Sequence, residues 1–395
     1  MKTLYIFLIL VVLPELLSAQ VCDINLLKAK VCVEQNKFDS ALVLLSLAGN
    51  SGLKAQLTGD SYYGKKQYGK AIENYLVADS LGVYTPGLAK SFLAINKQEK
   101  ATEALRSYLK QPQKISEAGL AKDPSFAAFL RTSAGKTIWQ GNWYSSSETV
   151  KNSVLALLSK RLFQEAQNEL DENEGKYSPR HEFFYLQALV YEKQKLPDQA
   201  LVFIEKAISL HTFSDNYFAL YARLLKSNKN YNDALENISK AIKINSYQPE
   251  YYIQRGEIAR LSGNYVQSEK DLKLYQELYS NEPETFHQLG LLEVAKGNYQ
   301  NAMDYYDALI AKDQTHAQYF LERGNIGLTL RQIEKADGDY SLALDLKPNL
   351  KDACLNKGKT LKELNDTTGA CFFWGRARDL GSSEAAKLIQ ANCKE

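Results

Sequence analysis

The hydrophobic positions of this chain follow a helical period over most of its length. Large apolar residues alternate with glycine or alanine at spacings of three and four, which places them on one face of a helix. Two such groups occur between residues 286 and 309: Phe286, Leu289 and Gly290, then Tyr299, Ala302, Tyr306 and Leu309. The turn Lys296-Gly297-Asn298 separates them. The pattern therefore predicts two consecutive helices joined by a short turn.

This arrangement returns every 34 residues. Small residues occupy one position of each period: Ala188, Ala222, Gly256, Gly290, Gly324 and Gly358. A large ring stands four residues before each, with one exception in the last period: Phe184, Phe218, Tyr252, Phe286, Phe320 and Cys354. A second small residue follows twelve residues later: Ala200, Ala234, Ser268, Ala302, Ala336 and Ala370. A fixed period of about 20–50 residues indicates a repeat architecture, in which each hairpin buries its apolar face against its neighbours.

The combination of ring, small residue, Gly-Asn-Tyr turn and second alanine resembles the tetratricopeptide repeat. The clearest match is Gly297-Asn298-Tyr299 with Ala302, and Ser268 is a departure from the pattern. The resemblance implies an all-α fold, an α-α superhelical solenoid of about nine to ten helix pairs. It also implies a protein that is not an enzyme and that binds other proteins.

The N-terminal residues 1–19 have the features of a signal peptide. Lys2 is followed by an apolar run from Leu4 to Leu13 and by small residues before Gln20. The end of this segment resembles signal peptides of Bacteroidota, which implies an exported protein, periplasmic or envelope-associated, with secretion as the alternative. Retention of the segment as an anchor stays open.

The remaining chain is expected to form three segments. Residues 20–112 hold repeats of a shorter period, marked by Ala29, Gly59 and Ala89. Residues 113–149 interrupt the phase with prolines, glycines and a serine run, which predicts an irregular joint with a helix around Phe126 to Arg131. Residues 150–395 resume the period of 34 and form a C-terminal array with a capping helix.

Five cysteines occur in a chain that we expect to be exported. Because the second helix of one repeat packs beside the first helix of the next, Cys371 and Cys393 could approach to disulfide distance. The sequence around them also resembles the C-terminal ends of bacterial tetratricopeptide repeat proteins. We therefore expect a disulfide between them that holds the cap, and we interpret Cys32 and Cys354 as small buried residues.

Charge and motifs argue against several functions. A net charge of +2 gives no electrostatic signature of nucleic-acid binding. The four histidines lack the spacing of a metal site, and no nucleophile, base and orienting group come together in the sequence. We expect no catalytic residue, no metal and no cofactor.

The first helices of such a solenoid line a concave groove. The positions that face this groove in the family hold these residues in the present chain: Arg223, Arg260, His287, Leu291, Val294, Leu321, Asn325, Leu328, Leu355 and Lys359. The later ones predict an exposed apolar strip with a basic end, which suits an extended peptide or an amphipathic helix. Packing of the leucines against a neighbouring helix or the cap is the alternative.

The sequence thus predicts a non-catalytic scaffold or adaptor that binds a peptide or protein segment in the groove. Two alternatives stay open: a structural subunit of an envelope or secretion assembly, and an accessory protein that binds a small molecule or glycan. The partner, the pathway and the oligomeric state are not predicted.

Overall fold

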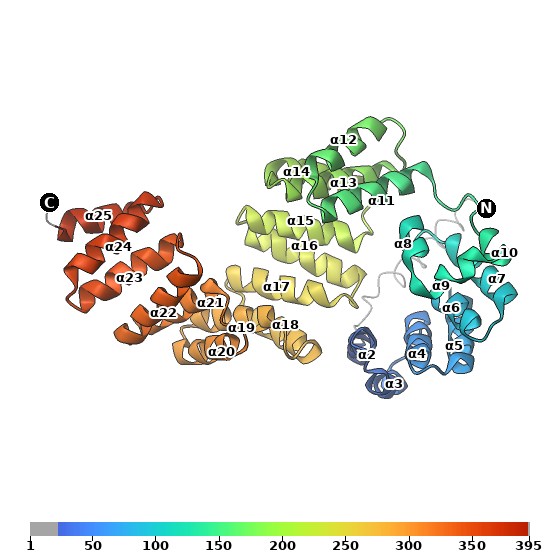
Figure 1. Cartoon of the computed structure of the whole chain (residues 1–395), viewed down its shortest axis with the longest axis horizontal. Helices are drawn as coiled ribbons and strands as arrows, with labels where there is room; N and C mark the ends of the chain where they lie inside the picture. The colour runs from blue at the N-terminus through green and yellow to red at the C-terminus, as the bar shows by residue number, and fades with distance from the viewer. Residues whose placement is uncertain (1–22, 394–395) are drawn as a thin grey trace, which may run out of the picture. The chain divides into compact units, whose positions relative to one another are not determined.

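The structure is a computed structural model that describes residues 23–393. These residues form helices and turns, and no strand occurs among them (Figure 1). By its internal contacts the chain divides into two compact units after Tyr251. The predicted all-α fold built from consecutive helix pairs is confirmed. Residues 1–22, with the predicted signal peptide and Cys22, lie outside the described residues.

Within residues 23–251, the described part of the first unit, there are six helix pairs, three on each side of the joint. Before the joint these are α2 (Ile24–Glu34) with α3 (Phe38–Leu47), α4 (Gly52–Gly64) with α5 (Tyr68–Ser80), and α6 (Gly87–Ala94) with α7 (Gln98–Leu109). After it come α11 (Ser146–Ser159) with α12 (Phe163–Asn173), α13 (Arg180–Lys193) with α14 (Pro197–Leu210), and α15 (Asp215–Ser227) with α16 (Tyr231–Ile244).

The joint itself is made of short helices. They are α8 (Glu117–Lys122), α9 (Pro124–Ala127), the 3₁₀ helix η1 (Phe129–Arg131) and α10 (Ser133–Lys136). The single helix expected around Phe126 to Arg131 is wrong, because the helix stops at Ala127 and a separate 3₁₀ turn follows. Phe126, Phe129 and Leu130 still share one buried cluster with Leu105 and Leu109 of α7.

The second unit continues the same plan. Its pairs are α17 (Pro249–Leu261) with α18 (Tyr265–Leu278), α19 (Pro283–Lys296) with α20 (Tyr299–Lys312), α21 (Ala317–Thr329) with α22 (Ile333–Leu346), and α23 (Lys351–Glu363) with α24 (Thr367–Asp379). The boundary between the two units, after Tyr251, falls inside α17. The helix α25 (Ser383–Asn392) packs on α24 and ends the array.

The turns that join the two helices of each pair follow the two periods of the sequence, 30 and 34 residues, in their backbone conformation. Each of these turns contains one residue with positive φ, and these residues are 30 apart before the joint and 34 apart after it: Asn36, Lys66 and Asn96, then Arg161, Lys195, Lys229, Gly263, Gly297, Arg331 and Asn365. Left-handed backbone is unfavourable for residues with a Cβ atom. The tight connection between paired helices therefore imposes this conformation whether or not a glycine is present.

At Gly59, Gly290, Gly324 and Gly358 the glycine of the first helix lies under a ring from the second helix, whereas the aliphatic side chain of Leu272 lies over Gly256. A Cβ atom added to Gly324 would stand 2.8 Å from the Tyr340 ring, and one added to Gly358 would stand 2.4 Å from the Trp374 ring. Tyr340 and Trp374 are almost completely buried. The glycines thus allow a large ring to enter between the two helices, which explains the spacing of small and large residues in the sequence.

The C-terminal end has the predicted disulfide. Cys371 of α24 and Cys393, just after α25, are joined with their Cα atoms 5.8 Å apart. Leu388 and Ile389 of α25 pack against the core of the second unit. Cys354 is a buried free thiol, and Cys32 is half-buried. Burial raises the pKa of both thiols. No helix within residues 23–393 is long and apolar enough to span a bilayer.

Candidate functional site

The predicted groove residues of the second unit lie on its first helices, but they do not form an exposed apolar strip. Leu321 of α21 is 4% exposed and Leu355 of α23 is 8% exposed, and both belong to the core cluster of Phe320 and Cys354. The expectation that these two leucines are exposed is wrong. Successive first helices contact each other, as α21 and α23 do, so the side chains at that seam are buried. Val294 and Leu328 pack at the edge of the same core, and Leu291 is half-buried.

The accessible part of this surface is polar instead. Asn325 of α21 accepts hydrogen bonds at Oδ1 from the Tyr340 hydroxyl (3.0 Å) and from Nδ2 of Asn356 on α23 (2.9 Å). All three side chains come from different helices, and the Tyr340 hydroxyl reaches Asn325 because the ring crosses Gly324. Asn325 Oδ1 thus already accepts two hydrogen bonds, and Asn325 Nδ2 donates to Glu322 Oε2 at 3.4 Å. The further hydrogen-bonding capacity of this half-buried pair therefore lies mainly in Asn356, since an amide has two donors and two acceptor lone pairs.

His287 of α19 and Lys359 of α23 extend this row on either side. His287 Nδ1 lies 3.3 Å from the Tyr306 hydroxyl, and its ring is 5.7 Å from the ring of Tyr319. Burial lowers the pKa of His287. Lys359 forms an ion pair with Glu384 of α25 at 2.8 Å. We call His287, Asn325, Asn356 and Lys359 the polar row.

The remaining predicted residues are engaged within the fold. Arg223 of α15 makes a two-point ion pair with Glu192 of α13, with Nε 2.8 Å from Oε1 and Nη2 3.3 Å from Oε2. Arg260 of α17 donates to Gln288 Oε1 at 3.4 Å. Both arginines therefore contribute contacts between first helices of consecutive repeats. Whether they also contact a partner stays a prediction.

The first unit has a related aromatic cluster where its first helices begin. His181 Nδ1 lies 2.9 Å from the Tyr217 hydroxyl, and the His181 ring stacks on that of His211 at 4.5 Å. Burial, reinforced by the neighbouring His211, lowers the pKa of His181. Tyr185 stacks on Tyr217 at 4.7 Å, and burial raises the pKa of Tyr185 to about 12. The interleaved histidines and tyrosines thus pack on one another along this surface.

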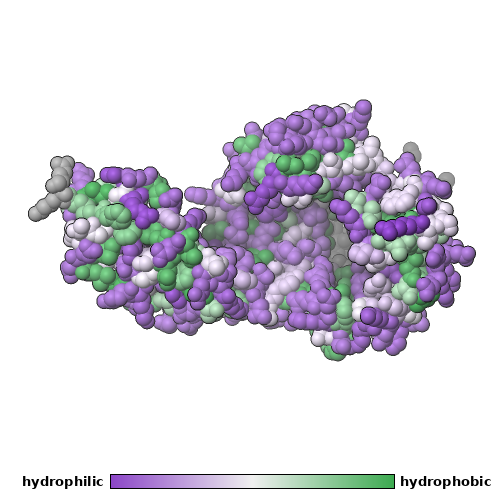
Figure 2. All heavy atoms as spheres, in the orientation of Figure 1, coloured by the Kyte–Doolittle hydropathy of each residue, from purple (hydrophilic) through white to green (hydrophobic). Residues whose placement is uncertain are grey.

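Exposed apolar residues in the described part of the second unit lie mainly on second helices, where the sequence did not lead us to expect them. Val266 is 83% exposed and Phe372 is 61% exposed. The full set is Val266, Leu342, Leu346, Leu364 at a helix end, and Phe372. Figure 2 shows hydrophilic residues over most of the face in view, with hydrophobic residues in separate patches.

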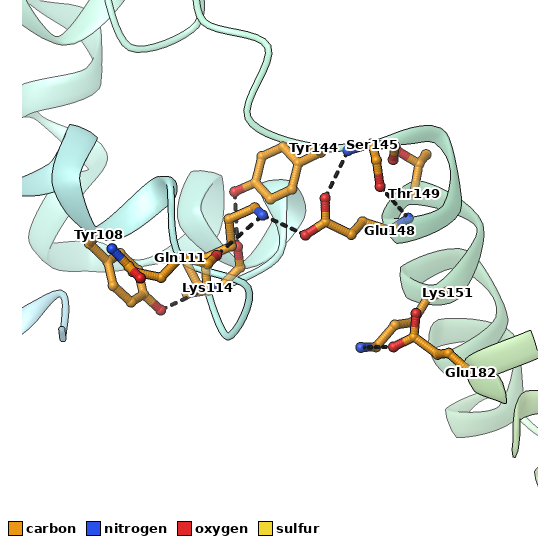
Figure 3. Close-up of polar contacts among 10 residues, drawn as sticks. Tyr108, Gln111, Lys114, Tyr144, Ser145, Glu148, Thr149, Lys151 and Glu182 are labelled. Carbon is orange, nitrogen blue, oxygen red and sulfur yellow. Dashed lines mark hydrogen bonds and ion pairs between the residues drawn. The ribbon is translucent and has the colours of Figure 1, made fainter. Parts of the chain in front are cut away.

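A polar network that was not predicted from the sequence holds the joint to α11 (Figure 3). Lys114 forms an ion pair with Glu148 and donates to the Gln111 carbonyl, and its side chain is only 7% exposed. The Tyr144 hydroxyl donates to the Ile115 carbonyl at 2.9 Å, and the Ile115 amide donates to the Tyr108 hydroxyl at 2.7 Å. One signal was available: Ser145 and Glu148 form a capping box, whose Ser-x-x-Glu spacing before an apolar run is visible in the sequence.

No three metal-binding side chains stand together among residues 23–393. Within these residues the helix pairs are stacked in order, with aromatic and amide side chains between them.

Two stretches of the chain match family models described as tetratricopeptide repeat, residues 181–210 and residues 287–350. The fold is that of a tetratricopeptide-repeat solenoid. Among curated protein sequences, none matches this chain.

Solved structures share this fold at low sequence identity. A tetratricopeptide repeat protein from Parabacteroides merdae is similar with a TM-score of 0.53 and 16% identity, over 63% of this chain and 99% of that one. A chain of the APC/C hetero-tetramer Cut9–Hcn1 is similar with a TM-score of 0.55 and 13% identity, over 93% of this chain and 82% of that one. At these identities the likeness concerns the fold alone.

Proposed function

We propose that this protein is a non-catalytic scaffold that holds a peptide or protein segment against the polar row of its second unit. The observation that carries the proposal is the linked pair of amides, Asn325 and Asn356, on consecutive first helices. Amide side chains can pair with the backbone N–H and C=O groups of an extended peptide, which every peptide has at regular intervals. Tetratricopeptide repeat solenoids generally mediate such contacts between proteins.

The burial of the groove leucines changes how the peptide segment would be recognised. Because Leu321 and Leu355 belong to the core, apolar anchors contribute less than hydrogen bonds and charge. Lys359 is paired with Glu384, but Lys362, three residues further along α23, is exposed and gives the row a basic end, where an acidic segment would be favoured. We further propose that the protein works outside the cytoplasm, in the periplasm or envelope, since disulfides such as Cys371–Cys393 persist in oxidising compartments.

Binding through second helices is a second candidate, because Val266 and Phe372 expose large apolar side chains there. That surface would suit the structural subunit of a larger assembly. The two candidates place the partner on different helices, which makes them separable by one experiment.

The experiment is site-specific photo-crosslinking of the full chain in its native cell envelope. A photoreactive amino acid is placed at Thr329 or Lys362, which are exposed on first helices, and at Val266 or Phe372 as the matched second-helix positions. We expect partner adducts from Thr329 and Lys362, and we expect Asn325→Ala with Asn356→Ala to reduce them several-fold. Adducts from Val266 and Phe372 alone would contradict the proposal.

A further inference from the structure

A cavity of about 640 Å³ lies in the first unit between the joint and α11, remote in sequence from the polar row. One wall comes from α8, with Glu117, Ala118 and Ala121, and another wall comes from α11, with Asn152, Ser153 and Ala156. Trp139 and Tyr144, from the segment between these helices, complete the lining. This volume falls in the range of about 300–1,000 Å³ that is typical of small-molecule sites.

The polar network of the joint fixes the two walls relative to each other (Figure 3). Lys114 and Ile115 immediately precede α8, whereas Tyr144 and Glu148 are at the start of α11. The Lys114–Glu148 ion pair and the hydrogen bond from Tyr144 to the Ile115 carbonyl therefore join the bases of both walls. A site whose walls are braced in this way loses little conformational freedom when it binds a ligand.

The chemistry of the lining limits the class of ligand. Its only charged residue is Glu117, and the nearby Lys114 is buried and paired, so an anionic ligand would find no counter-charge. Its apolar area comes from alanines and two aromatic rings, with no branched aliphatic side chain. A pocket for an apolar anchor residue of a peptide would gain most from such branched side chains, which fill space around it.

Polar side chains of the cavity lining are available to form hydrogen bonds with a ligand. The Asn152 amide, the Ser153 hydroxyl and the Glu117 carboxylate form no side-chain hydrogen bond or ion pair within residues 23–393. Trp139 lines the cavity and is 38% exposed, so part of its ring is accessible. A flat ring beside unpaired amide, hydroxyl and carboxylate groups matches a ligand that has one apolar face and many hydroxyls.

We propose that this cavity binds an uncharged saccharide, a short oligosaccharide of pyranose units. The C–H bonds on the apolar face of a pyranose carry partial positive charge and are attracted to the negative face of an aromatic ring. Trp139 supplies that ring. The Asn152 amide and the Ser153 hydroxyl can donate hydrogen bonds to the sugar hydroxyls or accept hydrogen bonds from them, and the Glu117 carboxylate accepts hydrogen bonds from them. This site is independent of the scaffold function proposed above.

The test is calorimetric titration of the full chain with maltotriose, cellotriose and chitotriose. We expect saturable binding of at least one of them, with a change in tryptophan emission. Trp139→Ala should weaken that binding at least about tenfold through lost stacking and lost burial. Asn152→Ala with Ser153→Ala should weaken it several-fold.

Two further variants keep the result interpretable. Ala156→Phe fills the cavity from its exposed wall without removing a hydrogen bond, and it should also abolish binding. Phe213→Ala removes a ring that is 76% exposed outside the cavity, and it should leave binding unchanged. Helical circular dichroism verifies that each variant is folded.

Three results would overturn the proposal. One is the absence of saturable binding by all three saccharides. Another is saccharide binding that persists in both Trp139→Ala and Ala156→Phe. The third is that an amphipathic peptide, rather than any saccharide, binds the wild-type chain and is lost in these variants. None of the three bears on crosslinking at the polar row.

Discussion

The repeats after residue 150 and the joint at 113–149 bring helices together by different physical means. In the repeats a large side chain of the second helix crosses the small residue of the first, as the Tyr340 ring crosses Gly324 and Leu272 crosses Gly256. In the joint a buried ion pair and tyrosine hydrogen bonds connect short helices to α11. The apolar packing of the repeats recurs with the sequence period. The polar network of the joint occurs once, and it joins side chains that are far apart in the sequence.

This difference has a consequence for stability. Loss of a ring leaves a cavity between two helices and exposes no new charge. Loss of one partner in the joint leaves a charged or polar group without its counterpart in a poorly hydrated place. The two regions should therefore respond to different perturbations.

The largest loss of stability is expected for Trp374→Ala in the last full repeat. Trp374 is 1% exposed, packs over Gly358 and donates from Nε1 to the Leu355 carbonyl at 3.2 Å. Its removal should lower the free energy of unfolding by about 3–5 kcal/mol, measured by chemical denaturation. Phe372→Ala, on the same helix but 61% exposed, should change it by no more than about 0.5 kcal/mol. Equal losses in both variants would mean that the ring over Gly358 is not what holds this pair together.

A smaller effect is expected for Lys114→Met in the joint. Methionine keeps the aliphatic packing but leaves Glu148, whose side chain is 28% exposed, without its cation. The joint should lose about 1–2 kcal/mol, seen as faster hydrogen exchange near Ile115 and Tyr144. Lys151→Met is the control, because Lys151 pairs with Glu182 but is 37% exposed, and its effect should be below about 1 kcal/mol. Unchanged exchange near Ile115 in Lys114→Met would show that the ion pair does not fasten the joint.

Acid should weaken the joint through Glu148. Partial burial alone would raise the pKa of this carboxyl, but hydrogen bonds from Lys114 and from the Ser145 amide outweigh it and lower the pKa below its ordinary value. Because the folded pKa lies below the unfolded one, this contribution is complete above the ordinary glutamate pKa and is lost as the pH falls through the folded value. Melting curves from neutral to acidic pH should therefore show a smaller acid loss in Glu148→Gln than in the wild type. A loss of the same size in both would exclude this carboxyl as the cause.

The smallest effect on stability, and the only expected increase, concerns the turn that contains Lys229. Lys229 is exposed and has φ of 60°, a conformation that is unfavourable for residues with a Cβ atom. Lys229→Gly should raise the free energy of unfolding by about 0.5–1 kcal/mol. This net gain is the backbone strain that glycine relieves in the folded turn, reduced by the greater conformational entropy of glycine in the unfolded chain. Gly263→Ala, at the equivalent turn with open space around it, should destabilise by a similar amount. Thermal denaturation of both variants measures the difference, and shifts of the same sign would contradict the argument.

The repeats could be predicted from sequence because their packing is local. Gly290 and Tyr306 are 16 residues apart, and the same relation recurs in each period, so the spacing alone indicates which residues meet. The positions of the turns follow in the same way. The exposure of Leu321 and Leu355 was predicted wrongly, because a position on a first helix does not tell how closely the next first helix approaches it.

The joint could not be predicted to the same extent. Lys114 and Glu148 carry no periodic signal, and their meeting depends on how the four short helices between them are arranged. Only the capping box at Ser145 was readable, and it fixes the start of α11 without indicating what packs against it. The cavity beside Trp139 was beyond prediction for the same reason.

The recurrence of one left-handed residue at the same place in every turn has a practical consequence for protein engineering. Cutting the chain after Gly297 and rejoining it after Arg331 would excise one complete period and connect two backbone segments of the same conformation. Since each repeat contacts mainly its neighbours, the shortened chain should need no new loop. The array is thus built so that whole modules can be removed or inserted at its turns.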